Sequence, residues 1–177
     1  MASANLYHLF YMLFDQQKIY NCLENMEKKP SISSAFVPLR TLGEGSCFVA
    51  YEYPHYGYPM DYAVLVEKTG VWVDQPFYRR FFSRRSQWID ALNTLGAHSL
   101  SLPLIPPLVA FEYLDKAVLV LPKGLCLRLD LCHDAQQLLR ETLIKLRAYG
   151  FVMKDKIQIA RFENEIFIHD FSDLSPY

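Results

Sequence analysis

The segment LGEGSCFVAYEY, residues 42–53, contains two glycines one residue apart and then a run of alternating apolar and polar residues. The alternation predicts a β-strand over 47–53, and residues 39–42 predict its antiparallel partner. Glycine lets backbone N–H groups approach another group closely, so the turn is either an ordinary hairpin or a loop that binds phosphate. Motifs elsewhere in the sequence are needed to distinguish these two interpretations.

The remainder of the chain predicts an alternation of helices and strands. Helical spacing of apolar residues indicates three helices, at 5–28 with a break near Asp15, at 76–95 and at 134–148, the last ended by Gly150. Runs rich in Val, Tyr and Phe indicate further strands at 62–68, 108–113, 117–121, 156–162 and 165–171. This order predicts an α+β fold with a mostly antiparallel five-stranded sheet and one interposed helix, followed by a helical part with a small hairpin.

Composition restricts the class of protein. Of the 177 residues 51% are apolar and 21% are charged, which predicts a packed core in one domain or two small lobes. The net charge of −1 predicts neither a nucleic-acid nor a membrane partner. Four cysteines without a C-x-x-C pair predict free thiols in a reducing compartment. Because no apolar run approaches the roughly 20 residues of a membrane span, we expect a cytoplasmic protein, delivered into a host cell if it is a secreted effector.

Motifs near both ends of residues 38–173 resemble those of protein kinases. Residues 42–50 resemble the glycine-rich loop G-x-G-x-x-G-x-V, with Phe48 at the third glycine. Near the other end, 153–155 (Met-Lys-Asp) stands where H-R-D would be, and 169–172 (His-Asp-Phe-Ser) resembles D-F-G with its flanking residues. The resemblance implies a two-lobed kinase-like fold with an N-terminal helical extension and linker (1–37), an N-lobe (38–122) and a truncated C-lobe (123–177). Only seven residues follow Asp170, without the activation segment and lower helices of typical kinases, and in this the chain resembles minimal, atypical kinases of the bacterial effector type.

The resemblance also implies a site for ATP and Mg²⁺ (or Mn²⁺). The loop residues that would cover the phosphates are Gly43, Glu44, Gly45 and Ser46. In the same scheme Lys68 would pair with the phosphates, Asp170 would hold the metal, and Asp155 would act as the catalytic base that orients the attacking hydroxyl.

The register of the strand lysine is open. If Tyr62-Ala63-Val64 corresponds to the V-A-I of V-A-I-K, then Leu65 stands at the lysine position. If the turn before the strand is longer than in kinases, the register shifts by three residues and Lys68 stands at the lysine position. No glutamate lies between Glu67 and Glu112 to serve as the helix partner of that lysine, and Asp90 or Gln87 would have to replace it. The second metal ligand, an asparagine in kinases, is Ala160 in direct register, with Gln158 and Asn164 nearby.

Two functions follow from the resemblance. One is a minimal atypical protein kinase that transfers the γ-phosphate of ATP to a protein hydroxyl in a Mg²⁺-dependent reaction. The other is a pseudokinase, catalytically weak or inactive, that acts as a protein-interaction module. An unrelated α+β domain with chance motif matches is the third possibility. The apolar stripe of the 5–28 helix predicts packing either on one lobe or on a second copy of the chain in a homodimer.

Overall fold

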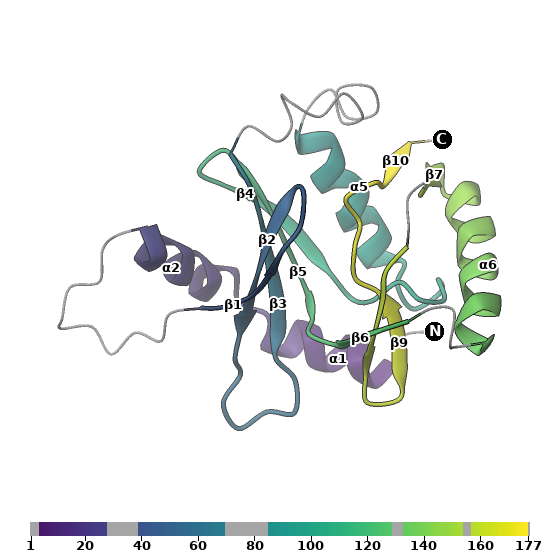
Figure 1. The fold of residues 1–177 in the computed structure, drawn as a ribbon, viewed down its shortest axis with the longest axis horizontal. Helices are drawn as coiled ribbons and strands as arrows, with labels where there is room; N and C mark the ends of the chain where they lie inside the picture. Colours follow the sequence, from purple (N-terminus) through teal and green to yellow (C-terminus); the bar gives the residue numbers. More distant parts are fainter. Residues whose placement is uncertain (1–3, 28–38, 70–84, 129–132, 154–156, 177) are drawn as a thin grey trace.

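The fold is a curved five-stranded sheet with helices on both faces and a smaller, mixed C-terminal part (Figure 1). The computed structural model describes residues 4–27, 39–69, 85–128, 133–153 and 157–176. The first half of the chain forms α1 (Ala4–Leu13), α2 (Gln16–Glu27), β1 (Arg40–Glu44), β2 (Phe48–Tyr53), β3 (Tyr62–Glu67) and α5 (Arg85–Ala97). The second half forms β4 (Val109–Tyr113), β5 (Lys116–Pro122), β6 (Leu125–Leu127), α6 (His133–Ala148), β7 (Phe151–Val152), β8 (Ile159–Phe162), β9 (Glu165–Ile168) and β10 (Ser175–Pro176).

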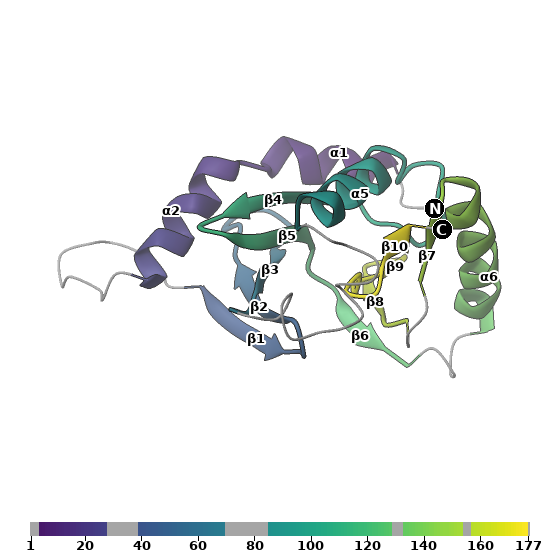
Figure 2. The same ribbon diagram turned by 90° about the horizontal axis from the view of Figure 1, so that it is seen from above.

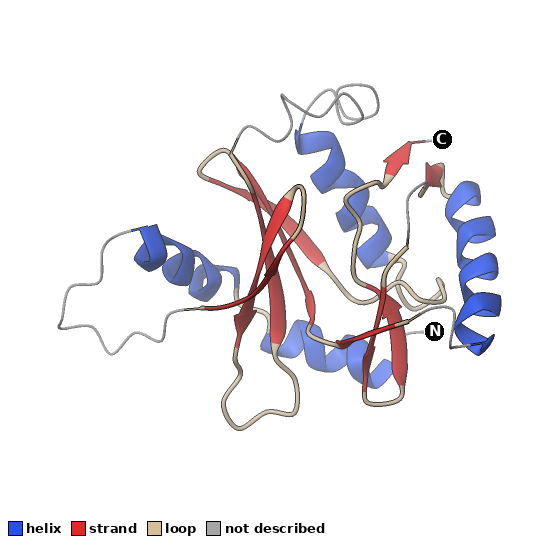
Figure 3. Ribbon diagram, viewed as in Figure 1, coloured by secondary structure: helices blue, strands red, loops and turns tan. Residues whose placement is uncertain are grey.

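The five-stranded sheet has the order β1-β2-β3-β5-β4, and each neighbouring pair is antiparallel. Its two faces are separated by the alternation of side chains along each strand. On β5, Leu119 and Leu121 contribute to a core shared with α5, whereas Val118 and Val120 contribute to a core shared with α1 and α2. We call these two sides the α5 face and the α1–α2 face. Figure 3 shows the sheet between the helices, which confirms the predicted sheet with one interposed helix.

The N-terminal helices pack on the α1–α2 face. The predicted helix over 5–28 is two helices, divided near Asp15 as expected, and Phe10 and Ile19 are almost fully buried. The Tyr62 hydroxyl on β3 donates a hydrogen bond of 2.7 Å to the Phe10 carbonyl, and Tyr11 donates one of 3.1 Å to the Leu108 carbonyl. The chain's own sheet therefore covers much of the apolar stripe. Homodimerisation through this stripe stays a prediction.

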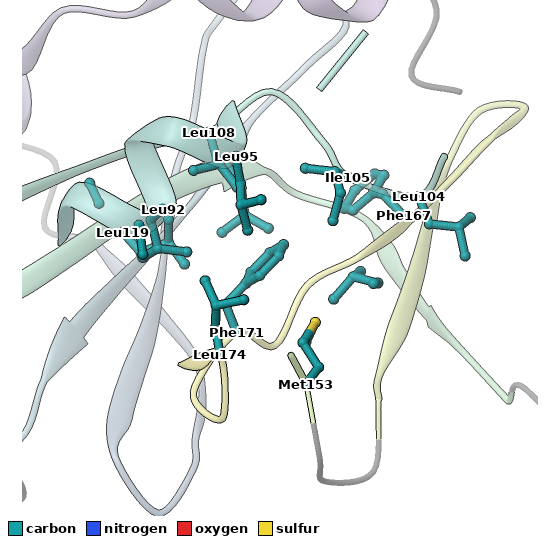
Figure 4. Close-up of a cluster of buried hydrophobic side chains, with 14 of the residues drawn as sticks. Leu92, Leu95, Leu104, Ile105, Leu108, Leu119, Met153, Phe167, Phe171 and Leu174 are labelled. Carbon is teal, nitrogen blue, oxygen red and sulfur yellow. The ribbon is translucent and has the colours of Figure 1, made fainter. Parts of the chain in front are cut away.

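Helix α5 supplies the main hydrophobic core. The predicted helix over 76–95 is present from Arg85 to Ala97, and residues 76–84 lie outside the described residues. Trp88, Leu92 and Leu95 are fully buried, as their helical spacing predicted. Figure 4 shows how the core continues from α5 and the sheet into the C-terminal part. Its labelled members are Leu92, Leu95, Leu104, Ile105, Leu108, Leu119, Met153, Phe167, Phe171 and Leu174.

The C-terminal part combines α6 with short strands. Helix α6 ends as predicted before Gly150, whose φ of +83° suits glycine. The two predicted strands are shorter than expected: β8 covers only 159–162, and β9 stops at Ile168 because residues 170–172 form a turn. These strands extend β6 into a three-stranded sheet, and β10 pairs with β7. No helix in the described part of the chain is long and apolar enough to span a bilayer.

Candidate functional site

The glycine segment forms the β1–β2 hairpin. Strand β1 runs through Gly43 to Glu44, with a bulge between Thr41 and Gly43, so the turn is shorter than predicted. The Gly45 N–H donates to the Phe48 carbonyl at 2.9 Å and is therefore engaged within the turn. Among the described residues, a Cβ at Gly43 would meet nothing within 4 Å, and one at Gly45 would meet only the Phe48 carbonyl oxygen at 3.8 Å. Packing against the described part of the chain does not require either glycine.

Phe48, at the third glycine position, packs inward from the loop. Only 7% of its surface is exposed, and its ring stacks on that of Trp88 with centroids 5.2 Å apart and planes at 23°. Phe48 and Trp88 belong to the same buried cluster as Phe171 of the D-F-S stretch. An aromatic side chain thus joins the hairpin to α5 on the α5 face of the sheet.

Strand β3 presents Leu65, not a lysine, on the α5 face. In the antiparallel pairing Ala50 lies opposite Leu65 and Phe48 lies opposite Glu67. Ala63 and Leu65 pack against the main core. Lys68 follows the last residue of β3. The α5 face of β3 therefore carries, in order, two apolar side chains and one carboxylate.

Lys68 contacts the glycine hairpin. Its Nζ lies 2.5 Å from Glu44 Oε1, and its backbone N–H donates to the Cys47 carbonyl at 2.9 Å. The structure thus brings Lys68 and Glu44, two of the residues predicted for the site, into one ion pair. Both side chains are partly exposed, at 28% and 63%. In this arrangement the ammonium group lies beside the loop and is neutralised by a carboxylate of the loop itself.

Glu67 is a buried carboxylate that the motif comparison did not identify as important. It is 4% exposed and accepts hydrogen bonds from Arg85 Nε at 2.6 Å and from the Ala117 N–H at 2.7 Å. Arg85 also lies 3.6 Å from Glu112. The hydrogen bond to Glu67 raises the pKa of Arg85, against the opposing effect of burial. Strand alternation places Glu67 on the same face as Leu65, and this pattern in the sequence could have predicted that Glu67 faces α5.

Asp170 is engaged in a local turn. Its Oδ1 accepts hydrogen bonds from the Ser172 N–H at 3.0 Å and the Ser172 hydroxyl at 2.7 Å, and Gln158 Nε2 donates to Oδ2 at 3.4 Å. Burial lowers the pKa of the neighbouring His169, although the Asp170 charge opposes this. The Phe171 carbonyl accepts a hydrogen bond of 3.2 Å from the Trp88 indole. Asp155 lies outside the described residues.

These residues fit a magnesium nucleotide poorly. A nucleotide site of the kinase type needs a cation on the third strand and open space below the loop. The described residues place Leu65 and the carboxylate of Glu67 there, with Phe48 packed against α5. Within the described ranges no three His, Cys, Asp or Glu side chains cluster as metal ligands would. Asp170 offers a single carboxylate with one oxygen already bonded twice.

No protein-family model and no curated protein matches the sequence. Among solved structures, the chain is similar to two mutant forms of the PknI kinase domain from Mycobacterium tuberculosis. The TM-score is 0.53 for both, with 16% and 17% identity over 80% and 83% of this chain. Vaccinia related kinase 3 follows with a TM-score of 0.49 and 14% identity, over 90% of this chain and 57% of that one.

The chain spans 62% and 66% of the two PknI kinase-domain structures. At these identities the likeness concerns the fold and not the residues of the site. It agrees with the antiparallel five-stranded sheet, the interposed α5 and the mixed C-terminal part described above. The chain has a reduced, two-lobed, protein-kinase-like fold.

Proposed function

We propose that this chain is a pseudokinase, a kinase-shaped module that binds another protein and does not transfer phosphate. The observation that carries the proposal is the stacking of Phe48 on Trp88, with ring centroids 5.2 Å apart. In the kinase arrangement the phosphates of ATP lie below the glycine-rich loop. Here the third loop position carries an aromatic side chain that packs from the hairpin onto α5.

The charge on β3 supports the same function. Phosphoryl transfer depends almost entirely on positioning and on neutralisation of phosphate charge. The buried ionisable group on the α5 face of β3 is the carboxylate of Glu67, and its partner Arg85 is already bound to it. A carboxylate near phosphate oxygens repels them, and Leu65 adds no positive charge.

A minimal atypical kinase is the second candidate, because Lys68 lies beside the glycine hairpin. In that case Lys68 would exchange its bond to Glu44 for one to a phosphate, below a loop whose two glycines are not required by packing. Asp170 would hold Mg²⁺ or Mn²⁺, which would neutralise phosphate charge when bound, and Asp155 would orient a protein hydroxyl.

Thermal-shift measurements on the full chain with ATP and either Mg²⁺ or Mn²⁺ test the two functions. A ligand at a hundred times its Kd stabilises a folded protein by about 2.7 kcal/mol, which is roughly 5–10 °C in a protein of this size. The pseudokinase assignment predicts no such rise, and no transfer of labelled phosphate to the chain or to a general protein substrate.

Two variants separate the candidates. If ATP raises Tm and labelled phosphate is transferred, and Lys68→Met and Asp170→Ala abolish the transfer, the minimal kinase is correct and the pseudokinase assignment is wrong. Glu141→Ala is the matched control, since Glu141 is an acidic residue exposed on α6 and has no role in the candidate site. Its activity would equal that of the unmodified chain.

A further inference from the structure

The loop between β2 and β3, residues 54–61, joins the two strands at the end opposite to the glycine hairpin (Figure 1). At its tip, Tyr56 and Tyr58 are 75% and 54% exposed. At its base, Met60 and Tyr62 are fully buried. The loop therefore presents an aromatic tip to solvent from a base that is fixed in the core.

The backbone of this loop is held by three hydrogen bonds. The His55 N–H donates to Asp61 Oδ1 at 3.0 Å, and the Tyr58 N–H donates to the His55 carbonyl at 3.0 Å. The Lys123 N–H, just after β5, donates to the Asp61 carbonyl at 2.9 Å. Each of these bonds involves His55 or Asp61, so the observed, closed form of the loop depends on these two residues.

The His55 ring lies among tyrosine rings beside the α1–α2 face. Its centroid is 4.3 Å from that of Tyr62, with planes at 85°, and 5.0 Å from that of Tyr53. Figure 2 shows α1 and α2 along this face of the sheet. The Tyr62 hydroxyl is bonded to the Phe10 carbonyl of α1 and its ring is fully buried. The ring that can leave the cluster without disturbing the core is therefore that of His55.

Protonation of His55 conflicts with this position. Its Nε2 is buried and finds no hydrogen-bond partner among the residues that the structure describes. A neutral imidazole can leave Nε2 as an unused acceptor, but an imidazolium carries N–H on both nitrogens, and a buried donor without an acceptor is costly. Burial lowers the pKa of His55, with the Asp61 charge opposing the shift and Lys18 of α2 adding to it. Asp15, 3.7 Å from Lys18, offsets part of that repulsion.

We propose that His55 is a pH switch, which holds the β2–β3 loop closed when its ring is neutral and releases the loop when its ring is protonated. In the open form the imidazolium lies in water, the bond to Asp61 is lost, and the tip with Tyr56 and Tyr58 changes its orientation. The pairing of β2 with β3 stays intact, because it involves no residue of the loop. The switch uses no residue of the candidate nucleotide site, so it goes beyond the proposed function and does not depend on it.

Hydrogen exchange of the full chain, followed by backbone NMR between pH 7.5 and 5.5, tests this inference. In the open loop the ring has the ordinary histidine pKa of about 6.5, so the ratio of open to closed loop should rise up to about tenfold over this range. After correction for the intrinsic exchange rate, the protection of the His55 and Tyr58 amides should fall by the same factor. Low, non-denaturing urea should leave this protection unchanged, because a local opening exposes little surface.

His55→Phe keeps a ring that packs on Tyr62 but binds no proton, so the protection of the Tyr58 amide should become independent of pH. His8→Phe is the matched control, since His8 is an exposed histidine on α1, and its loop should respond to pH like that of the unmodified chain. A second measurement needs no variant. In the unmodified chain, the ring-to-ring NMR contacts between His55 and Tyr62 should disappear as the imidazole titrates.

Three results would overturn the inference. The first is a His55 imidazolium that keeps its contacts with Tyr62. The second is protection of the loop amides that falls only together with that of the β2 and β3 amides, which would mean that the whole fold opens. The third is a pH response of the loop that persists in His55→Phe.

Discussion

Glu67 and Arg85 form a two-point ion pair that joins the end of β3 to the first turn of α5. Arg85 Nε lies 2.6 Å from Glu67 Oε2, and a second guanidinium nitrogen lies 3.3 Å from Oε1. In protein kinases a lysine on the third strand pairs with a glutamate on the following helix. Here the strand carries the acid and the helix carries the base. The ion pair thus joins the strand to the helix with the two charges in the opposite order.

Arg85→Met should destabilise the fold by about 3 kcal/mol, because it leaves the buried Glu67 carboxylate without its cation. Glu67→Gln should cost only about 1 kcal/mol, since the amide oxygen still accepts from the Ala117 N–H. Chemical denaturation of both variants measures the difference. Lys18→Met is the control, because the Lys18–Asp15 pair is largely exposed and its loss should be within experimental error. Equal effects of Arg85→Met and Lys18→Met would contradict a structural role for the pair.

Gly43→Ala and Gly45→Ala should be tolerated, and each should leave the free energy of unfolding unchanged or raise it by up to about 1 kcal/mol. Neither added Cβ meets a close neighbour. Gly96→Ala on α5 is the contrasting variant, because its Cβ would lie 2.5 Å from the Leu108 carbonyl oxygen and should cost about 2 kcal/mol or more. Chemical denaturation of the three variants measures these changes in the free energy of unfolding. A loss of stability in Gly43→Ala similar to that in Gly96→Ala would show that the hairpin needs its glycine for the fold.

The sequence was sufficient to predict the sheet and its helix because their patterns are local. Alternation identified β2 to β5, and the spacing of Trp88, Leu92 and Leu95 identified the buried side of α5. Strands β6, β7 and β10 have only two or three residues, too few for alternation to be recognised. Their existence depends on pairing with distant segments.

The candidate site was predicted less completely because its contacts join distant residues. The sequence showed that Phe48 departs from the third glycine, but its stacking on Trp88 depends on how the hairpin approaches α5. The V-A-I-K motif predicts a lysine at the end of the third strand, so the sequence pointed to Lys68 and not to Glu67. The partner Arg85 could be assigned only once the fold brought α5 to the end of β3.

Stability should fall as the pH is lowered below about 6.5, the ordinary pKa of histidine. Burial lowers the pKa of His55 in the fold, with Asp61 opposing the shift and Lys18 adding to it. The unfolded chain then binds a proton at a higher pH than the folded chain, so the folded state is fully favoured above 6.5 and loses stability as pH falls toward the lowered pKa. Thermal melts between pH 7.5 and 5.5 measure this loss.

His55→Phe should flatten that pH dependence. The His55 ring packs edge-on against Tyr62 at 4.3 Å, and within the described residues its buried Nε2 has no hydrogen-bond partner, so phenylalanine can take its place. His169, whose pKa is also lowered by burial, should account for part of the slope that remains. An unchanged slope in His55→Phe would mean that this ring does not titrate in the window.

Leu114→Asn should raise the free energy of unfolding by about 0.5–1 kcal/mol, because asparagine tolerates the positive φ that leucine does not. Leu114→Ala is the control: it removes the same exposed side chain but keeps the backbone cost, so it should give no gain. Denaturation of both variants is the measurement. A gain of equal size in Leu114→Ala would place the penalty in the exposed side chain and not in the backbone.

The bond between the Trp88 indole and the Phe171 carbonyl spans 83 positions of the chain. Phe171, Leu174 and Ser175 are almost fully buried, and β10 closes against β7. On the ribosome, the sheet with α1 and α2 can assemble early, but the core around α5 stays open until residues 171–175 have been made. From the synthesis of α5 until residues 171–175 have been made, the nascent chain therefore leaves part of this apolar core uncovered, and this is the interval in which a chaperone could bind it.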